Sequence, residues 1–202
     1  MKRVLNVLIL GLVIIAMFGC ASTKQTVEYK PTDEVTILSG RWNDTDSKMV
    51  AEQMIKDMIY RPWITDYMLE MDEKPVLIVG KIRNKSSEHI DTEIFTKDIE
   101  RELINNGKVK FVATSKERMD ILEERYHQQS HASDETAVSL AQETGANFML
   151  IGSVKSITDA ISGKAAIFYQ TDLELINIET NEKVWIGTKE IKKVISKSKT
   201  KW

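Results

Sequence analysis

The sequence has few of the residues that build disulfide frameworks and metal centres. It contains one cysteine and three histidines among 202 residues. A disulfide or a cysteine-based zinc cluster needs several thiols, so the single Cys20 excludes both. The charges nearly cancel, with 28 basic groups against 30 acidic ones and a formal net charge of −2. This balance argues against a nucleic-acid-binding protein, which usually concentrates basic residues on one face.

Motifs that carry catalysis are also lacking. The sequence has neither a G-x-S-x-G elbow nor the spacing of a phosphate-binding loop. His127 and His131 are four residues apart, as in helical zinc sites, but the glutamate of the HExxH motif does not lie between them. The carboxylates fall mostly at helix caps and on solvent-facing positions. The sequence therefore nominates no catalytic residue, no metal ligands and no cofactor.

The N-terminus carries the pattern of a targeting segment. The basic start MKR is followed by an apolar run from Val4 to Phe18, then by Gly19 and Cys20. This run is shorter than the roughly 20 apolar residues of a membrane-spanning helix and fits the core of a signal peptide. Its end, MFGC, resembles the lipobox of bacterial lipoproteins, in which the cysteine is lipidated and becomes the first residue. We expect residues 1–19 to be a signal peptide and Cys20 the lipid-attachment site, with an uncleaved signal anchor as the alternative.

The mature chain is predicted to consist of a tether, one globular domain and a tail. Residues 20–39 are of mixed character, contain Pro31 and show no sustained hydrophobic period, so they are expected to form a tether. Residues 40–194 are expected to form a single domain. Residues 195–202 are rich in lysine and are predicted to be a solvated basic tail.

The first helix of the domain is predicted over residues 47–60. Asp44, Thr45 or Asp46 can cap it, and apolar residues then recur at helical spacing. Pro62 is expected to end this helix. The following stretch, residues 61–74, is predicted to cross the surface without regular structure.

A βαβ unit is predicted next. Residues 75–84, PVLIVGKIRN, have the composition of a buried strand. Asp91 or Thr92 can cap a following helix, which Gly107 ends. Its apolar face is expected to hold Ile94, Phe95, Ile99, Leu103 and Ile104. A short strand over residues 108–114 completes the unit, and its two strands should be parallel.

The remainder of the domain is predicted to hold two helices and three strands. The helices are expected over residues 115–128 and 133–144, and the strands over residues 147–157, 164–178 and 183–194. Short turns between these strands favour an antiparallel meander. The fold class is therefore α+β: a βαβ unit, two helices and a three-stranded meander, in one mixed sheet flanked by helices.

The second turn of the meander also predicts a strand register. With Thr180 and Asn181 at its centre, opposed residue numbers sum to 361. Leu175 then opposes Ile186 in the core, and Ile176 opposes Trp185 on the other face.

Two surfaces are candidates for partner binding. The first is the polar loop after the predicted strand over residues 75–84, because loops on a rigid scaffold commonly carry binding. The alternative is that its amide and hydroxyl side chains only satisfy turn hydrogen bonds. The second is Trp185 with Ile176, although a tryptophan is equally an ordinary core residue. The candidate binding residues are Arg83, Asn84, Ser87, Glu88, His89 and Trp185.

An ordered series of stretches resembles the LpoB family, outer-membrane lipoprotein activators of class A (bifunctional) penicillin-binding proteins. The resemblance extends over residues 40–194. Its stretches are SGRWNDTDSKMVAEQMI from Ser39, KIRNKSSEHIDTE from Lys81, INNGKVKFV from Ile104, QETGANFMLIGS from Gln142 and LELINIETNEKVWIG from Leu173.

This resemblance implies a protein that is not an enzyme. Such a protein is anchored in the outer membrane by its lipid, faces the periplasm, is monomeric on its own and activates a peptidoglycan synthase. Ala21 after the cysteine is compatible with transport to the outer membrane, since aspartate at this position retains many lipoproteins in the inner one. The alternative is a structural or secretion component, because curli-secretion lipoproteins and the N-terminal domain of TolB have related folds. Such a component would assemble with itself.

The length of the tether limits its reach. The 20 peptide steps from Cys20 to Gly40 span at most about 70 Å when extended and average about 25 Å as a random coil. Either the partner must project toward the outer membrane, or the helix predicted over residues 47–60 must detach to lengthen the tether.

Overall fold

The computed structural model describes residues 26–32, 34–113, 115–128 and 145–196. The predicted signal peptide, Cys20, the helix predicted over residues 133–144 and the last six residues lie outside this description. The chain divides into two compact units, one ending at Val35 and the other beginning at Thr36. The described part of the first unit has no helix or strand and is exposed. No helix within the described residues has both the length and the apolar character needed to span a bilayer.

Helix α2 (Asp44–Ile59) begins three residues earlier than predicted. Its cap is Asn43, whose side-chain oxygen accepts a hydrogen bond from the amide of Asp46 at 3.0 Å. In return, the carboxylate of Asp46 accepts from the amide of Asn43 at 2.9 Å, which completes a capping box. The expected caps at Asp44, Thr45 or Asp46 are therefore wrong by at least one residue. The helix buries one apolar face in the core, formed by Val50, Ala51, Met54, Ile55, Met58 and Ile59.

Residues 62–71, predicted to be irregular, form helix α3 (Pro62–Met71). Pro62 is at the start of this helix, where its fixed φ angle suits the first turn and its missing N–H is not needed. The indole of Trp63 donates to the carbonyl of Met58 at 2.9 Å and packs edge-on against Phe148, with ring centroids 5.1 Å apart. The proline thus separates two helices that the core holds together.

The βαβ unit is confirmed. Strands β1 (Val76–Asn84) and β2 (Lys110–Phe111) are parallel, and helix α4 (Thr92–Asn106) connects them. Asp91 caps α4 and Gly107 ends it at a φ of 67°. The apolar face of α4 is narrower than predicted, because Ile94 and Ile104 are 57% and 55% exposed.

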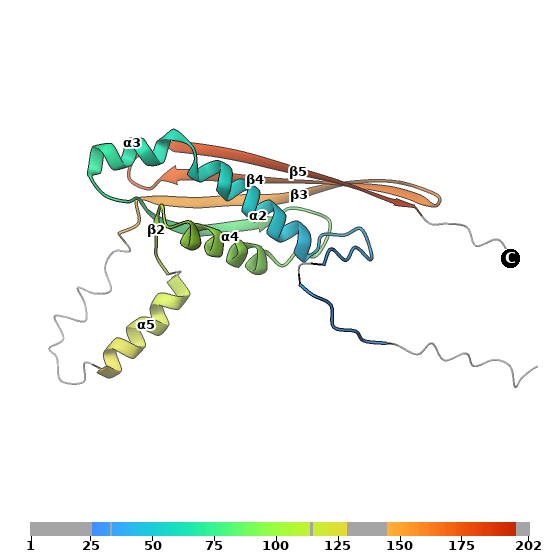
Figure 1. The fold of residues 1–202 in the computed structure, drawn as a ribbon, viewed down its shortest axis with the longest axis horizontal. Helices are drawn as coiled ribbons and strands as arrows, with labels where there is room; N and C mark the ends of the chain where they lie inside the picture. The colour runs from blue at the N-terminus through green and yellow to red at the C-terminus, as the bar shows by residue number, and fades with distance from the viewer. Residues whose placement is uncertain (1–25, 33, 114, 129–144, 197–202) are drawn as a thin grey trace, which may run out of the picture. The chain divides into compact units, whose positions relative to one another are not determined.

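The antiparallel meander is also confirmed, in strands β3 (Phe148–Ile161), β4 (Lys164–Asn177) and β5 (Lys183–Ser196). The five strands form one mixed sheet in the order β2-β1-β3-β4-β5. Helix α2 contacts β5 and α4, while α4 contacts β1, so both helices cover one face of the sheet (Figure 1). Helix α5 (Ser115–Gln128) follows β2 and matches its predicted range.

The predicted register between β4 and β5 is wrong by one residue. Opposed residue numbers sum to 360, so Leu175 pairs with Trp185 and Glu174 with Ile186. The cause is a longer turn, closed by a hydrogen bond of 2.8 Å from the amide of Asn177 to the carbonyl of Glu182. Next to the turn, Ile176 pairs with Lys183 and the sum is 359, and a register shift beside Leu175 raises it to 360 along the rest of the two strands. A one-residue slip exchanges the faces of a strand, which places Trp185 in the core and leaves Ile186 64% exposed.

The meander strands are longer than β1. Strand β1 ends at Asn84, which pairs with Val154, whereas β3 continues to Ile161. The ends of β3, β4 and β5 therefore project beyond β1 as a three-stranded extension (Figure 1). We call this part of the sheet the arm, and in β3 it comprises residues 157–161.

Candidate functional site

The β1–α4 loop, residues 85–90, is shaped by the side chain of Asn84. Its oxygen accepts hydrogen bonds from the amide of Ser86 at 2.9 Å and from the hydroxyl of Ser86 at 2.7 Å. Its amide nitrogen donates to the carbonyl of Glu88 at 2.7 Å. Asn84, predicted as a binding residue, therefore has its hydrogen-bonding groups used inside the loop. The alternative given above, that it satisfies the turn, agrees with this geometry.

Two further bonds fasten the loop to β3. The amide of Lys85 donates to the carbonyl of Val154 at 2.7 Å, which extends the pairing of β1 and β3 by one residue. The amide of Ser87 donates to the hydroxyl of Ser156 at 3.3 Å. The backbone of the loop is consequently fixed with respect to the sheet.

Glu88 fastens the loop to the core. Its carboxylate accepts a hydrogen bond of 2.8 Å from the hydroxyl of Tyr169 and one of 3.2 Å from the amide of Trp42. The Tyr169 ring is fully buried, and Trp42 packs edge-on against it with centroids 5.5 Å apart. Burial, together with the hydrogen bond to Glu88, raises the pKa of the Tyr169 hydroxyl. Glu88, which the sequence nominated for binding, therefore has a structural contact on each carboxylate oxygen.

The segment that enters the domain, residues 39–42, is held next to this loop. Lys193 donates to the carbonyl of Arg41 at 2.9 Å and forms an ion pair with Asp46. Gly40 has a φ of 71°, and a Cβ atom built there would lie 2.6 Å from the side chain of Ile195. Only glycine fits this position without displacing Ile195. We call residues 39–42 the junction.

Three basic side chains of the same region remain exposed. The side chains of Arg83, Lys85 and His89 make no hydrogen bond or ion pair to any part of the chain that the structure describes. Arg83 and His89 were predicted to bind the partner. Lys85 was missed, although its position between them in the sequence could have indicated it. The end of β1 and the β1–α4 loop thus present three basic side chains without hydrogen bonds or ion pairs in the described residues, an arrangement suited to the recognition of acidic groups.

Trp185 lies away from this loop and is buried. It is 6% exposed, and its indole donates to the carboxylate of Asp57 in α2 at 3.0 Å. Ile176 faces the opposite side of the sheet because of the register described above. The predicted surface patch of Trp185 and Ile176 is therefore not formed, and Trp185 packs between the sheet and α2.

The open face of the sheet, opposite α2 and α4, carries a polar network around Asp172. Its carboxylate accepts hydrogen bonds of 2.8 Å each from Lys155, Gln170 and Thr188. Burial works to raise the pKa of Asp172, but these hydrogen bonds outweigh it and hold the pKa below its ordinary value. The network is paired internally and supports the sheet.

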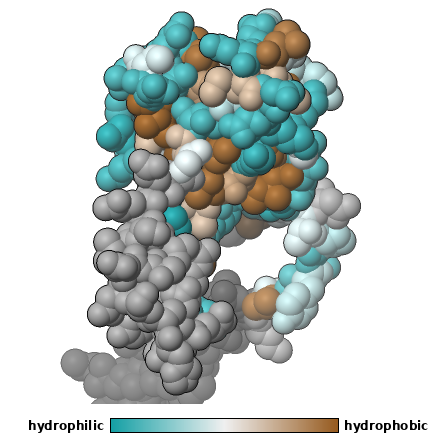
Figure 2. Space-filling model, turned by 90° about the vertical axis from the view of Figure 1, so that its left-hand side faces the viewer, coloured by the Kyte–Doolittle hydropathy of each residue, from teal (hydrophilic) through white to brown (hydrophobic). Residues whose placement is uncertain are grey.

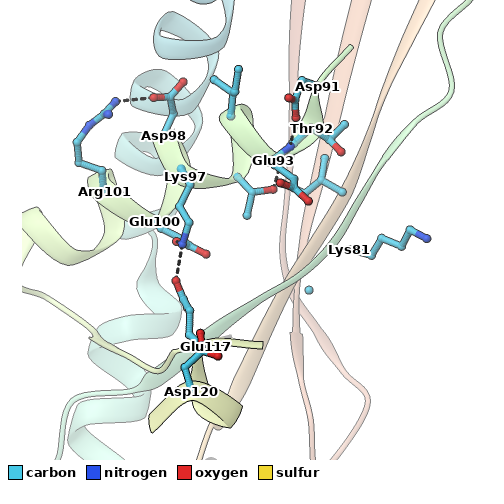
Figure 3. Close-up of a pocket in the computed structure, with 14 residues that line it drawn as sticks. Lys81, Asp91, Thr92, Glu93, Lys97, Asp98, Glu100, Arg101, Glu117 and Asp120 are labelled. Carbon is cyan, nitrogen blue, oxygen red and sulfur yellow. Dashed lines mark hydrogen bonds and ion pairs between the residues drawn. The ribbon is translucent and has the colours of Figure 1, made fainter. Parts of the chain in front are cut away.

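A pocket of about 880 Å³ lies between β1, α4 and α5, and it was not predicted (Figure 3). Three of the six carboxylates that line it are held in ion pairs. Asp98 pairs with Arg101 at 2.7 Å, while Lys97 lies between Glu100 at 2.6 Å and Glu117 at 2.7 Å. Hydrogen bonds to these two glutamates raise the pKa of Lys97 to about 12. Such paired carboxylates lack the separated acid and base that acid–base catalysis requires.

The opposite end of the domain carries exposed apolar side chains on α3. Figure 2 shows hydrophobic residues interspersed with hydrophilic ones at this end. Leu69 is the most exposed of them on α3, at 81%. This end adjoins the start of β1, whereas the β1–α4 loop follows its last residue.

Comparison with known proteins identifies a family. A family model described as "Peptidoglycan-synthase activator LpoB" matches residues 46–191, which include most of α2, the βαβ unit and most of the meander. No curated protein matches the chain.

Solved structures with similarity to this chain include the C-terminal domain of LpoB from Escherichia coli. It has 19% sequence identity and a TM-score of 0.47, and the match covers 72% of this chain and 98% of that one. The NMR structure of E. coli LpoB has 16% identity and a TM-score of 0.40, covering 88% and 85%. Lipoprotein GNA1162 from Neisseria meningitidis has 13% identity and a TM-score of 0.38, covering 59% and 83%.

Proposed function

The chain belongs to the LpoB family of peptidoglycan-synthase activators, and from this membership we propose that it binds and activates a class A penicillin-binding protein. The observation that carries the proposal is the match of the family model over residues 46–191. In this role the chain performs no catalysis itself. It binds one conformation of the synthase more tightly than the other and so increases the active fraction.

The β1–α4 loop is the proposed contact surface. Arg83, Lys85 and His89 are exposed and unpaired within the described residues, while Asn84 and Glu88 keep the loop rigid. A rigid loop loses little conformational entropy on binding, which favours affinity. The synthase is therefore expected to present acidic groups to this loop.

The proposed location is the periplasmic side of the outer membrane. Cys20 after the apolar run would carry the lipid, and two or more acyl chains give stable anchoring. The partner synthase would be anchored in the inner membrane. The family match favours an activator over the structural or secretion component considered above.

The proposal can be tested with purified components. The full-length lipidated chain in detergent is added to each purified class A penicillin-binding protein of the same organism, and glycan polymerisation from lipid II is measured. Activation by the wild-type chain is expected. The triple variant Arg83→Ala, Lys85→Ala, His89→Ala should bind at least tenfold more weakly with an unchanged melting temperature, because these exposed side chains make no hydrogen bond or ion pair within the described fold.

A matched control is Leu69→Ala at the α3 end, which should leave binding and activation unchanged. Absence of both binding and activation with every class A synthase of the organism would refute the proposed function. Activation that survives the triple variant would instead refute only the assignment of the loop.

A further inference from the structure

Strand β3 has a free edge beyond the end of β1. The amide of Lys85 donates to the carbonyl of Val154, so the backbone groups of Val154 point toward β1. Backbone groups alternate between the two sides of a strand, and those of Ser156, Thr158 and Ala160 therefore point the same way. The hydroxyl of Ser156 accepts a hydrogen bond from the loop amide of Ser87. No strand in the described part of the chain pairs with Thr158 or Ala160 on that side.

Two large apolar side chains along this edge are exposed. Residues 157–161 read Ile-Thr-Asp-Ala-Ile, with Ile157 and Ile161 exposed by 66% and 73% on the same face of the arm. This composition favours a β-strand and contains neither lysine nor proline. A soluble sheet usually protects such an edge with charged side chains or proline.

The edge of the sheet on β5 is protected by charged side chains. It carries the four lysines Lys183, Lys189, Lys192 and Lys193 along its 14 residues. The contrast between the two edges indicates that the edge of β3 is available for pairing, since both belong to the same meander.

The charged residues near the free edge of β3 indicate what kind of segment can pair with it. Arg83, Lys85 and His89 lie where the free edge begins, and Asp159 is the single charged residue within the edge. A strand placed in line with β1 would run from these three basic groups along Ile157 and Ile161. It would need acidic side chains near its start and apolar side chains on the face of the two isoleucines.

We infer that the partner synthase adds an extended segment of alternating apolar and acidic residues to the free edge of β3 at residues 157–161. This inference rests on the proposed function and specifies how the synthase is held. Main-chain hydrogen bonds to Thr158 and Ala160 supply affinity, and the basic loop with the two isoleucines supplies specificity.

A proline substitution tests the edge directly. Thr158→Pro removes an N–H that points away from β4, so the β3–β4 pairing keeps its hydrogen bonds. The control Thr158→Ala alters the side chain and retains this N–H. With the full-length chain in detergent and each purified class A synthase as probe, Thr158→Pro should weaken binding at least tenfold and Thr158→Ala less than twofold. Both variants should keep the wild-type melting temperature.

Amide hydrogen exchange on the wild-type chain gives a second, mutation-free measurement. The amides of Thr158 and Ala160 should exchange rapidly in the free chain and become protected in the complex. The amides of Ile157 and Asp159 should be protected in both states, because they point toward β4. If Thr158→Pro does not fold, hydrogen exchange on the wild-type chain and synthase binding by Ala160→Pro test whether the edge of β3 pairs with the synthase.

The outcomes separate the two proposals. A wild-type chain that binds no synthase refutes the proposed function and this inference with it. Binding that withstands Thr158→Pro and Ala160→Pro, with unprotected edge amides in the complex, refutes the inference alone. A dimer of the isolated chain that Thr158→Pro dissociates would assign the edge to a second copy instead of the synthase, and would also overturn the inference.

Discussion

The hydroxyl of Tyr169 donates a hydrogen bond of 2.8 Å to the carboxylate of Glu88, which lies 81 residues earlier in the chain. This single bond joins β4, at the base of the arm, to the β1–α4 loop. The other oxygen of the same carboxylate accepts from the amide of Trp42 in the junction. Glu88 therefore links the proposed binding loop, the start of the domain and the centre of the sheet.

Tyr169→Phe should lower the free energy of unfolding by about 1.5–3 kcal/mol, because it removes a buried hydrogen bond to a charged group. Chemical denaturation of the wild-type and variant chains measures this difference. Glu88→Gln in the Tyr169→Phe background should add little further loss, because the bond to Tyr169 is already absent and the glutamine oxygen can still accept from the amide of Trp42. Fully additive losses would contradict this view of the pair.

The same pair predicts an alkaline pH dependence. The folded-state pKa of Tyr169 is raised above its ordinary value of about 10, so its contribution to stability is complete below pH 10. That contribution is lost as the pH rises from 10 through the folded-state pKa. The stability difference between the wild-type chain and Tyr169→Phe should therefore shrink above pH 10 in denaturation experiments.

Asp172→Asn should destabilise the domain at pH 7 and much less at pH 3. The folded-state pKa of Asp172 is lowered, so its contribution is complete above the ordinary value near 3.8 and is lost as the pH falls through the folded-state pKa. Melting temperatures at the two pH values test this. Asp159→Asn, at an exposed carboxylate without an ion pair to the described residues, is the control and should show no such dependence.

Asn84→Ala should lower the melting temperature and weaken synthase binding together. Its side chain makes three hydrogen bonds that define the shape of the loop, and the alanine variant leaves their partners unsatisfied. Arg83→Ala should weaken binding without lowering the melting temperature. An Asn84→Ala chain of wild-type stability would show that the loop holds its shape by other contacts.

Cys20→Ser should abolish acylation and release the chain from the membrane fraction. The thiol is the only one in the sequence, so no other cysteine can replace it. Mass spectrometry of the N-terminus and fractionation of cells measure the change. A membrane-bound, acylated Cys20→Ser product would contradict the assignment of the lipid-attachment site.

Deletion of residues 28–39 should impair function in cells and leave synthase binding by the purified chain unchanged. The detachment of α2 considered above is disfavoured, because six of its apolar side chains lie in the core and the junction holds residues 39–42 to the domain. Under the proposed function, the tether alone would then provide the reach from the outer membrane. A Gly/Ser linker of equal length should restore function, and full cellular function after the deletion would show that reach is not limiting.

The sequence predicted the order of the elements because most carry strong local signals. Gly107 ended α4 as expected, and the turn at Gly163 joined β3 and β4. Helix α3 was missed because Pro62 was taken as the end of one helix, although it begins the next. The signal that could have found α3 is the apolar pair Trp63 and Ile64 directly after that proline.

The site was harder to predict than the fold. The sequence placed the polar residues in the loop correctly, but it could not show which side chains the loop itself uses. Glu88 meets Tyr169 and Trp42 from distant parts of the chain, and no local pattern reports such contacts. The register of β5 failed for a similar reason, because the irregularity next to Leu175 depends on how the turn closes.

The junction determines how the domain responds to mechanical load. If the chain is anchored and engaged with a partner as proposed, any pull on the tether enters the domain through residues 39–42. In this segment Arg41 is bonded to Lys193, Gly40 lies against Ile195, and Trp42 is bonded to Glu88. Force on the tether would thus act first on β5 and the β1–α4 loop, and it would reach α2 through the ion pair of Lys193 with Asp46. Tension on the tether would therefore act on the contact between Trp42 and Glu88, one of those that hold the proposed binding loop in place.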